Sequence, residues 1–142
     1  MTRRWRDERG SVSTEMAVVM IAFFAGFLML VVFAGRVAEA ENDVRSATHQ
    51  AARAASLTGD PARAESEARR VVEANLTSSG LTCRNGLDVI VNVDQFRPGG
   101  WVAVTVSCRA AFADVASLAV PGSRTFRSTA TEVIDTYRGD NR

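Results

Sequence analysis

The sequence predicts an α+β protein with one long membrane-spanning helix near its N-terminus, which extends into a small outer domain. That domain should hold a second helix and an antiparallel β hairpin or sheet. Three observations support this fold class. Twenty consecutive residues from Met16 to Gly35 carry no charge, and a helix-forming stretch without Pro or Gly follows from Arg36 to Leu57. Valines then alternate with more polar residues in Leu87–Asp94 and again in Trp101–Ser107.

The uncharged stretch has the length and composition of a membrane span. At about 1.5 Å rise per residue, a helix of this length reaches roughly 30 Å, the thickness of a bilayer's hydrocarbon core. Its Val, Ile, Leu and Phe side chains together favour insertion by about 3 to 7 kcal/mol. A buried helix of a soluble protein is the alternative, but such a helix rarely runs this far without a polar face.

Basic residues precede this span and set its expected orientation. The first ten residues contain four arginines against two acidic residues. By the positive-inside rule such a segment stays in the cytoplasm, so the chain beyond the span should lie outside. The expected location is therefore the cytoplasmic membrane, crossed once, with an extracytoplasmic C-terminal domain. An ordinary signal peptide fits less well, because Gly35–Ala40 offers only a poor Ala-x-Ala-like site with a charge inside it.

Five segments follow from this interpretation. They are a basic leader (1–10), a transmembrane helix (11–36), a helical extension with a second helix (37–80), a β-rich outer domain (81–137) and a polar tail (138–142). The formal charge of the chain is +1, and it becomes −1 if the leader's four arginines and two acidic residues are removed. Neither value creates a strong field, so no nucleic-acid binding is expected.

The first helix is expected to continue past the membrane, from Thr14 to Leu57, over about 66 Å. Small apolar residues recur in it at three- and four-residue steps: Val37, Ala40, Val44, Ala47, Ala51 and Ala54. This narrow stripe can pack against the helix's own domain or against neighbouring subunits, and both interpretations stay open. Within the span, Ala22 and Gly26 stand four residues apart, a spacing that lets two membrane helices approach closely.

The segment Thr58-Gly59-Asp60-Pro61 should end that helix and begin a second one. Gly59 suits a left-handed C-terminal position, Asp60 an N-cap and Pro61 the first helical turn. The second helix should end at Ser78–Gly80. The face that it is expected to bury comprises Ala64, Ala68, Val71, Val72 and Leu76.

The remaining chain predicts strands. The two stretches with alternating valines should pair through the turn at Phe96–Gly100. The Thr- and Val-rich segment Thr125–Thr136 is a candidate third strand. Between them, Ala113–Ala119 is ambiguous, with a short helix as one interpretation, and Pro121-Gly122 should end it.

The two cysteines, Cys83 and Cys108, both fall beyond the membrane span. Outside the cytoplasm, where thiols are oxidised, they are expected to form a disulfide. The bond would constrain a small domain with a limited core.

Residues that could carry enzymatic chemistry are sparse. His49 is the single histidine, the cysteines lack CxxC spacing, and no Gly-rich phosphate loop follows a strand. A zinc site or a histidine-based triad needs several such groups together. The sequence therefore favours a protein that is not an enzyme, without a metal, cofactor or small-molecule substrate.

The residues just before the span have a distinctive arrangement. Gly10 follows the basic head, Ser11 comes next, and Glu15 is the fifth residue after Gly10. This arrangement resembles the processing site of type IV pilins and pseudopilins. The resemblance implies that a prepilin peptidase cuts after Gly10, that Ser11 becomes the new N-terminus and that Glu15 is the family's glutamate. The alternative is that Glu15 is an ordinary N-terminal helix residue beside a Ser13 or Thr14 cap.

The order of parts along the chain resembles the TadE-like family. The likeness rests on Gly10–Arg36, on the run Ala51–Ala55, and on Pro121-Gly122 before Arg127–Thr131. It implies a minor pilin or pseudopilin involved in assembly of a Flp/Tad (tight adherence) pilus or a related secretion system. The implied partners are the membrane, a prepilin peptidase, other pilins and Tad assembly proteins. The alternative is an uncleaved single-pass membrane protein that binds a partner through its extracytoplasmic domain.

Overall fold

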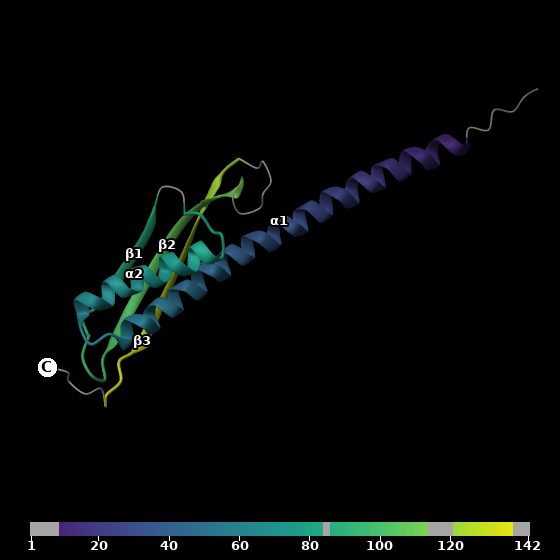
Figure 1. Cartoon of the computed structure of the whole chain (residues 1–142). Helices are drawn as coiled ribbons and strands as arrows, with labels where there is room; N and C mark the ends of the chain where they lie inside the picture. The colour runs from purple at the N-terminus through teal and green to yellow at the C-terminus, as the bar shows by residue number, and fades with distance from the viewer. Residues whose placement is uncertain (1–8, 84–85, 114–120, 138–142) are drawn as a thin grey trace, which may run out of the picture. The chain divides into compact units, whose positions relative to one another are not determined.

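The computed structural model describes residues 9–83, 86–113 and 121–137, with side chains described from Thr14 onward. Its elements are α1 (Arg9–Leu57), α2 (Pro61–Ser78), β1 (Leu87–Asn92), β2 (Trp101–Ala111) and β3 (Ser123–Val133) (Figure 1). Most of the basic leader, the ambiguous segment from residue 114 onward and the polar tail (138–142) lie outside the described residues. Two compact units divide the chain at the bond between Gly35 and Arg36.

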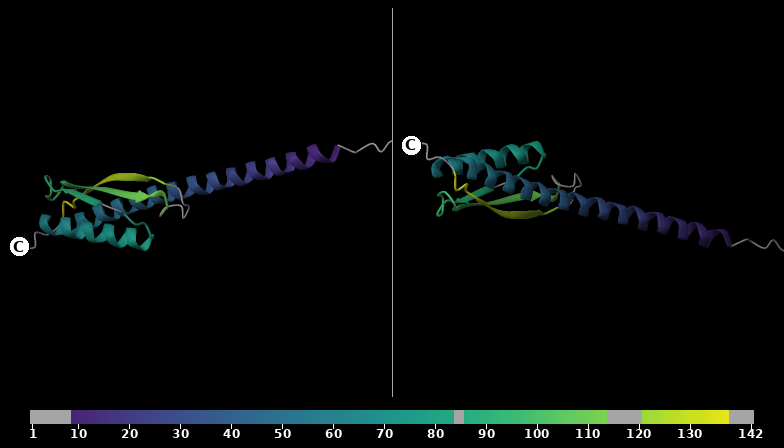
Figure 2. Two further views of the ribbon diagram at one scale, coloured as in Figure 1. Left: turned by 90° about the horizontal axis from the view of Figure 1, so that it is seen from above. Right: turned by 90° about the horizontal axis from the view of Figure 1, so that it is seen from below.

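The outer unit, which begins at Arg36, has two layers and confirms the α+β fold class. The strands form one antiparallel sheet in the order β1-β2-β3. Helix α2 and the part of α1 that belongs to this unit cover one face of the sheet (Figure 2). The third strand, a candidate in the sequence, is therefore part of the fold.

Buried and more exposed side chains alternate along β2, so the sheet has one buried face and one exposed face. Val104 and Val106 are fully buried, and their cross-strand neighbours Ala130 and Val89 are buried with them. The residues between them point to the other face, where the hydroxyls of Thr105 and Thr129 share a hydrogen bond of 2.9 Å. This is the pattern of an antiparallel sheet with one face packed on helices and one face open.

Mostly small side chains form the buried face of α1 in the outer unit. Its buried residues in the outer unit are Ala40, Val44, Ala47, Thr48, Ala51, Ala52, Ala55 and Ser56. The predicted stripe is confirmed at four of these positions, but Ala54 is only half buried, and Ala52 and Ala55 complete the contact instead. Thr48 is tolerated because its hydroxyl donates to the Val44 carbonyl at 2.6 Å, so no buried polar group lacks a partner there.

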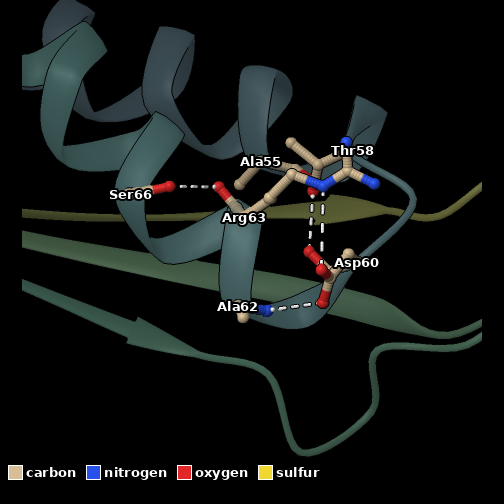
Figure 3. Close-up of polar contacts among 6 residues, drawn as sticks. All are labelled: Ala55, Thr58, Asp60, Ala62, Arg63 and Ser66. Atoms are coloured by element: carbon tan, nitrogen blue, oxygen red, sulfur yellow. Dashed lines mark hydrogen bonds and ion pairs between the residues drawn. The ribbon is translucent and has the colours of Figure 1, made fainter.

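The turn between the helices differs from the prediction at one residue (Figure 3). Asp60 is the N-cap of α2, and its carboxylate accepts the amide of Ala62 at 3.0 Å, as expected for this residue type before a proline. Gly59 is not left-handed, so that prediction is wrong. Thr58 closes α1 instead, because both its amide and its hydroxyl donate to the Ala55 carbonyl, at 3.1 and 2.9 Å.

The left-handed glycine of the helical pair is Gly80, at the end of α2, with φ = 74°. The Gly80 amide donates to the Thr77 carbonyl at 3.1 Å, and the Leu81 amide donates to the Leu76 carbonyl at 3.0 Å. These two bonds form a Schellman motif, which satisfies carbonyls that the helix leaves open. Leu81 then packs against the core and directs the chain toward the sheet.

The strands differ in length from the prediction because tertiary pairing sets their ends. β1 stops at Asn92, whose side-chain oxygen accepts the Asp94 amide at 3.0 Å in a local turn. β2 continues four residues past the predicted end, because its buried-exposed alternation persists and β3 supplies pairing partners as far as Ala111. β3 begins at Ser123, two residues early, and ends at Val133.

Cys83 and Cys108 are joined by a disulfide, with 5.2 Å between their Cα atoms. Cys108 lies inside β2 opposite Leu87, whereas the predicted strand ended one residue before it, at Ser107. Cys83 is half exposed, whereas Cys108 is fully buried. The bond therefore fixes the connection between α2 and β1 to the centre of the core.

Replacing Gly80 with Ala should destabilise the outer unit, because a side chain at φ = 74° costs about 1 to 2 kcal/mol. The matched control is Gly59→Ala. Neither glycine would bring a Cβ within 4 Å of another group, and only Gly80 has a left-handed backbone. The control should change stability by less than about 1 kcal/mol. Denaturant unfolding of the full chain in detergent measures both, and equal effects would contradict this account of the α2 terminus.

Removing the disulfide by the double change Cys83→Ala and Cys108→Ala should lower the free energy of unfolding. A closed segment of this length, with cysteines 25 residues apart, constrains the unfolded chain by about 3.5 kcal/mol. Adding a reductant to the unmodified protein should give a similar loss, and the double variant should not respond to it. An unfolding midpoint of the unmodified protein that ignores the reductant would show that the bond carries no such stability.

Candidate functional site

The first part of α1 presents its apolar side chains without protein cover. Every large apolar residue from Met16 to Val32 is exposed, from 48% at Met20 to 69% at Ile21. Among the described residues, the part of α1 from Thr14 to Leu57 is long and apolar enough to cross a membrane. Such a surface is stable where hydrocarbon or other apolar helices surround it. This segment is therefore a membrane-anchor candidate and the first feature of the site.

Charged residues reappear in the sequence directly after this apolar segment. Arg36 is the first charged residue after Glu15, and its guanidinium lies 3.1 Å from the Glu39 carboxylate. Both side chains are more than half exposed, so the pair adds little stability and serves mainly to keep this turn in water. The division between the two compact units falls at the same place.

Glu15 is the single charged residue between Thr14 and Gly35, and its side chain is exposed. It lines a shallow hollow on the surface of the helix with Thr14, Val18 and Val19. Because the backbone is helical from Arg9 onward, Ser11 and Glu15 lie one turn apart on the same face, about 6 Å along the axis. The helix thus aligns the residue after Gly10 with the carboxylate.

The alternative interpretation of Glu15 depended on a helix that begins at Ser13 or Thr14. That start is wrong, because α1 begins at Arg9 and has no acidic residue in its first turn. Ser13 and Thr14 lie inside the helix and not at its start. In the intact chain, Glu15 therefore sits past the first turn, where the helix dipole favours it little.

Gly10 is the second residue of α1. The first four amides of a helix have no partner within the helix, and glycine costs about 1 kcal/mol relative to alanine in a helix interior. The turn around Gly10 therefore has fewer hydrogen bonds within the helix than the turns that follow it. The side chains of residues 9–13 are not described, so the contacts of Ser11 stay a prediction.

Ala22 and Gly26 lie on one face of the anchor, one turn apart. A Cβ added at Gly26 would meet no atom within 4 Å, so nothing in the described structure occupies the space beside it. The pair is accessible to a neighbouring helix, and packing there stays a prediction.

The remaining titratable groups in the described part of the chain lie apart from this segment. No group of three His, Cys, Asp or Glu residues is placed to hold a metal ion there. His49 is exposed on α1. The hydrogen bond from Arg70 lowers the pKa of the Glu67 carboxyl and raises that of the guanidinium, but both groups lie on the open surface of α2.

Comparison with known protein families finds a match in the first helix. Residues 10–53 match the family described as TadE-like protein, so this part of the chain is a TadE-like domain. The matched region includes Gly10, Glu15, the anchor and most of the part of α1 that packs on the sheet. No curated protein shows significant similarity to the chain. No solved structure does either.

Proposed function

We propose, from the TadE-like domain at residues 10–53, that this protein is a minor pilin or pseudopilin that takes part in assembling a Flp/Tad pilus or related secretion system. The observation that carries the proposal is the uncovered apolar helix, which holds Gly10, Ser11 and Glu15 in register at its start. In a pilin-type subunit one such helix has two successive roles. It first anchors the subunit in the membrane and then packs against the helices of other subunits.

The anchor is inserted with its N-terminus in the cytoplasm. Four arginines precede the span, and positive charge resists transfer to the outer side. The chain beyond Arg36 then folds outside, where the Cys83–Cys108 disulfide can form. The disulfide and the charge distribution thus support the same topology independently.

A prepilin peptidase hydrolyses the peptide bond between Gly10 and Ser11. Water adds its hydroxyl to the Gly10 carbonyl carbon, and the Ser11 nitrogen leaves as an amine. The substrate bond must enter the peptidase in an extended form, and the weak first turn at Gly10 makes that local unwinding inexpensive. Cleavage removes the leader charges and creates a new helix start at Ser11.

Cleavage also changes the environment of Glu15. With Ser11 as the first residue, Glu15 comes within about one turn of the helix N-terminus, where the dipole favours a carboxylate. The new Ser11 ammonium lies on the same face and is one partner, and the ammonium of a neighbouring subunit is another. Attraction between such charges is several times stronger beside hydrocarbon than in water, so the contact can fix the register between helices.

The partners of this function are the membrane, the prepilin peptidase, other pilins and Tad assembly proteins. The protein acts by packing and presentation, and the proposal gives it no catalytic role. The small pair Ala22 and Gly26 is the part of the anchor that admits the closest helix neighbour. An uncleaved single-pass protein that binds a partner through its outer unit is the competing function, and the state of the N-terminus separates the two.

Gly10→Leu should leave the leader attached, because the peptidase reads the glycine. Its retained arginines then hold the subunit in the membrane, since extraction would draw them through hydrocarbon at a cost of about 2.5 to 3.5 kcal/mol each. Mass spectrometry of the N-terminus should show Met1 for this variant. Gly35→Leu, at the other end of the anchor, is the control and should be processed normally.

Glu15→Ala should instead be processed, at least in part, but should lose co-purification with other pilus proteins. The control is Glu39→Ala, which removes an exposed carboxylate just beyond the anchor and should leave assembly unchanged. If Gly10→Leu and Glu15→Ala are both cleaved and assemble like the unmodified protein, the match to a processing site is coincidental and the pilin function is wrong.

A further inference from the structure

The two edges of the sheet are not equivalent. β1 is short, spanning Leu87–Asn92, and a guanidinium nitrogen of Arg69 on α2 reaches the Val89 carbonyl at its outer edge, at 3.4 Å. β3 spans Ser123–Val133, and no described residue pairs with its outer edge. Proteins usually shorten or cover such an edge, because its free amides and carbonyls are a template for another strand. The open edge of β3 is therefore an interaction surface.

The hydrogen bonds at both ends of β3 show which residues face this edge. The Ile134 amide donates to Gly100, the Gly99 amide donates to Ile134, and the Phe112 amide donates to Gly122. Ile134 and Gly122 therefore turn toward β2. From Gly122 to Ile134 the pairing with β2 is continuous, and backbone amides and carbonyls of successive residues point to opposite sides of the strand. The even-numbered residues of β3 therefore direct these groups toward β2. The odd-numbered residues, all exposed, direct their amides and carbonyls outward.

Three residues of β1 direct their backbone groups away from β2. The Val89 carbonyl accepts from Arg69 and so points away from β2. By alternation, Leu87 and Val91 also direct their backbone groups outward. The side chain of Asp88, between them, lies on the exposed face of the sheet, as does that of Arg127 on β3.

Membrane anchoring limits the direction of a partner strand that belongs to another copy of the chain. Antiparallel pairing of β3 with β3 would relate two outer units by a twofold axis that reverses the strands. The part of α1 inside each outer unit would be reversed with them, so the two chains would enter the pair at Arg36 from opposite directions, whereas subunits anchored in one membrane enter from the same side. A partner strand must therefore run parallel to β3, and β1 does so, because both strands are antiparallel to β2.

We propose that the β3 edge of one copy binds the β1 edge of a second copy in parallel, with Arg127 opposite Asp88 of the second copy. This inference rests on the proposed assembly function, which gives the copies a common direction. In a parallel ladder each residue bonds to the neighbours of its opposite residue. Arg127 would thus bond to Leu87 and Val89 of the second copy, whose backbone groups point outward as required.

The alternating backbone directions allow several registers between β3 and β1, and the charges of Arg127 and Asp88 favour this one. Arg127 and Asp88 are exposed, and neither forms an ion pair with another described residue. Shifting the second copy by two residues would place Asp88 opposite Thr125 or Thr129 and leave Arg127 without a carboxylate. On the buried side, the chosen register sets Phe126 beside Leu87, which joins apolar surfaces.

One existing contact must open for the second copy to bind. Arg69 is an exposed residue, and its bond to the Val89 carbonyl is long at 3.4 Å. Backbone pairing with β3 would replace that bond and leave the guanidinium in water. The Arg69 contact therefore covers the β1 edge in a single copy and is replaced on assembly.

Cysteine cross-linking in membranes tests the register. One tagged copy carries Thr129→Cys, and a second copy with another tag carries Ile90→Cys. These positions are opposite in the proposed pairing, at a distance that permits a disulfide. Mild oxidation should give a mixed dimer. The control pairs Thr125→Cys with Ile90→Cys. In the proposed register these two positions are displaced by about 13 Å along the strands, so no mixed dimer should form.

Charge exchange gives a second readout. Arg127→Asp in the first copy should lower the mixed-dimer yield about fivefold, and Asp88→Arg in the second copy should restore it. No mixed dimer, or a dominant Thr129→Cys homodimer, would overturn the edge contact. Leader removal is read by mass in the same cells. Normal removal without cross-linking refutes only this contact, whereas retention of the leader contradicts the proposed function itself.

Discussion

The uncovered apolar surface of α1 is the constraint on which the rest of the structure depends. The large apolar side chains from Met16 to Val32 are exposed among the described residues and need hydrocarbon or other helices around them. The same helix must then serve in water beyond Arg36, where its apolar surface narrows to a stripe of small residues. In the proposed function this continuous helix meets the membrane first and water beyond it, and side-chain size and charge change at Arg36.

The outer unit is built around that stripe. Ala47 and Ala51 are fully buried in the same core as the valines of β2, and α2 completes the cover over one face. A core of such small residues buries little apolar area per residue, which explains why the Cys83–Cys108 bond matters for this unit. No described element covers the opposite face of the sheet or the outer edge of β3, and the proposed assembly would use the backbone groups of that edge.

Periodicity made much of this predictable from the sequence. The span, the second helix with its Asp60 cap, the valine hairpin and the cysteine pair each leave a local pattern. Other features depend on contacts that no local pattern encodes. Gly59 and Gly80 both follow helical segments, but the Thr58 hydroxyl closes the first helix and only Gly80 becomes left-handed. The predicted β2 was too short because β3, far along the sequence, supplies its pairing partners. The outer edges of β1 and β3 differ because Arg69, on α2, contacts only the edge of β1.

The central claim is that the chain is a pilin-type subunit whose anchor helix starts at Ser11 after processing. Its most direct test is the N-terminal residue of the mature protein, isolated from membranes of cells that also contain the prepilin peptidase. Mass spectrometry should find Ser11 at the N-terminus, with the ten leader residues absent. An N-terminus at Met1 in the whole mature population would contradict the account and would favour an uncleaved single-pass protein.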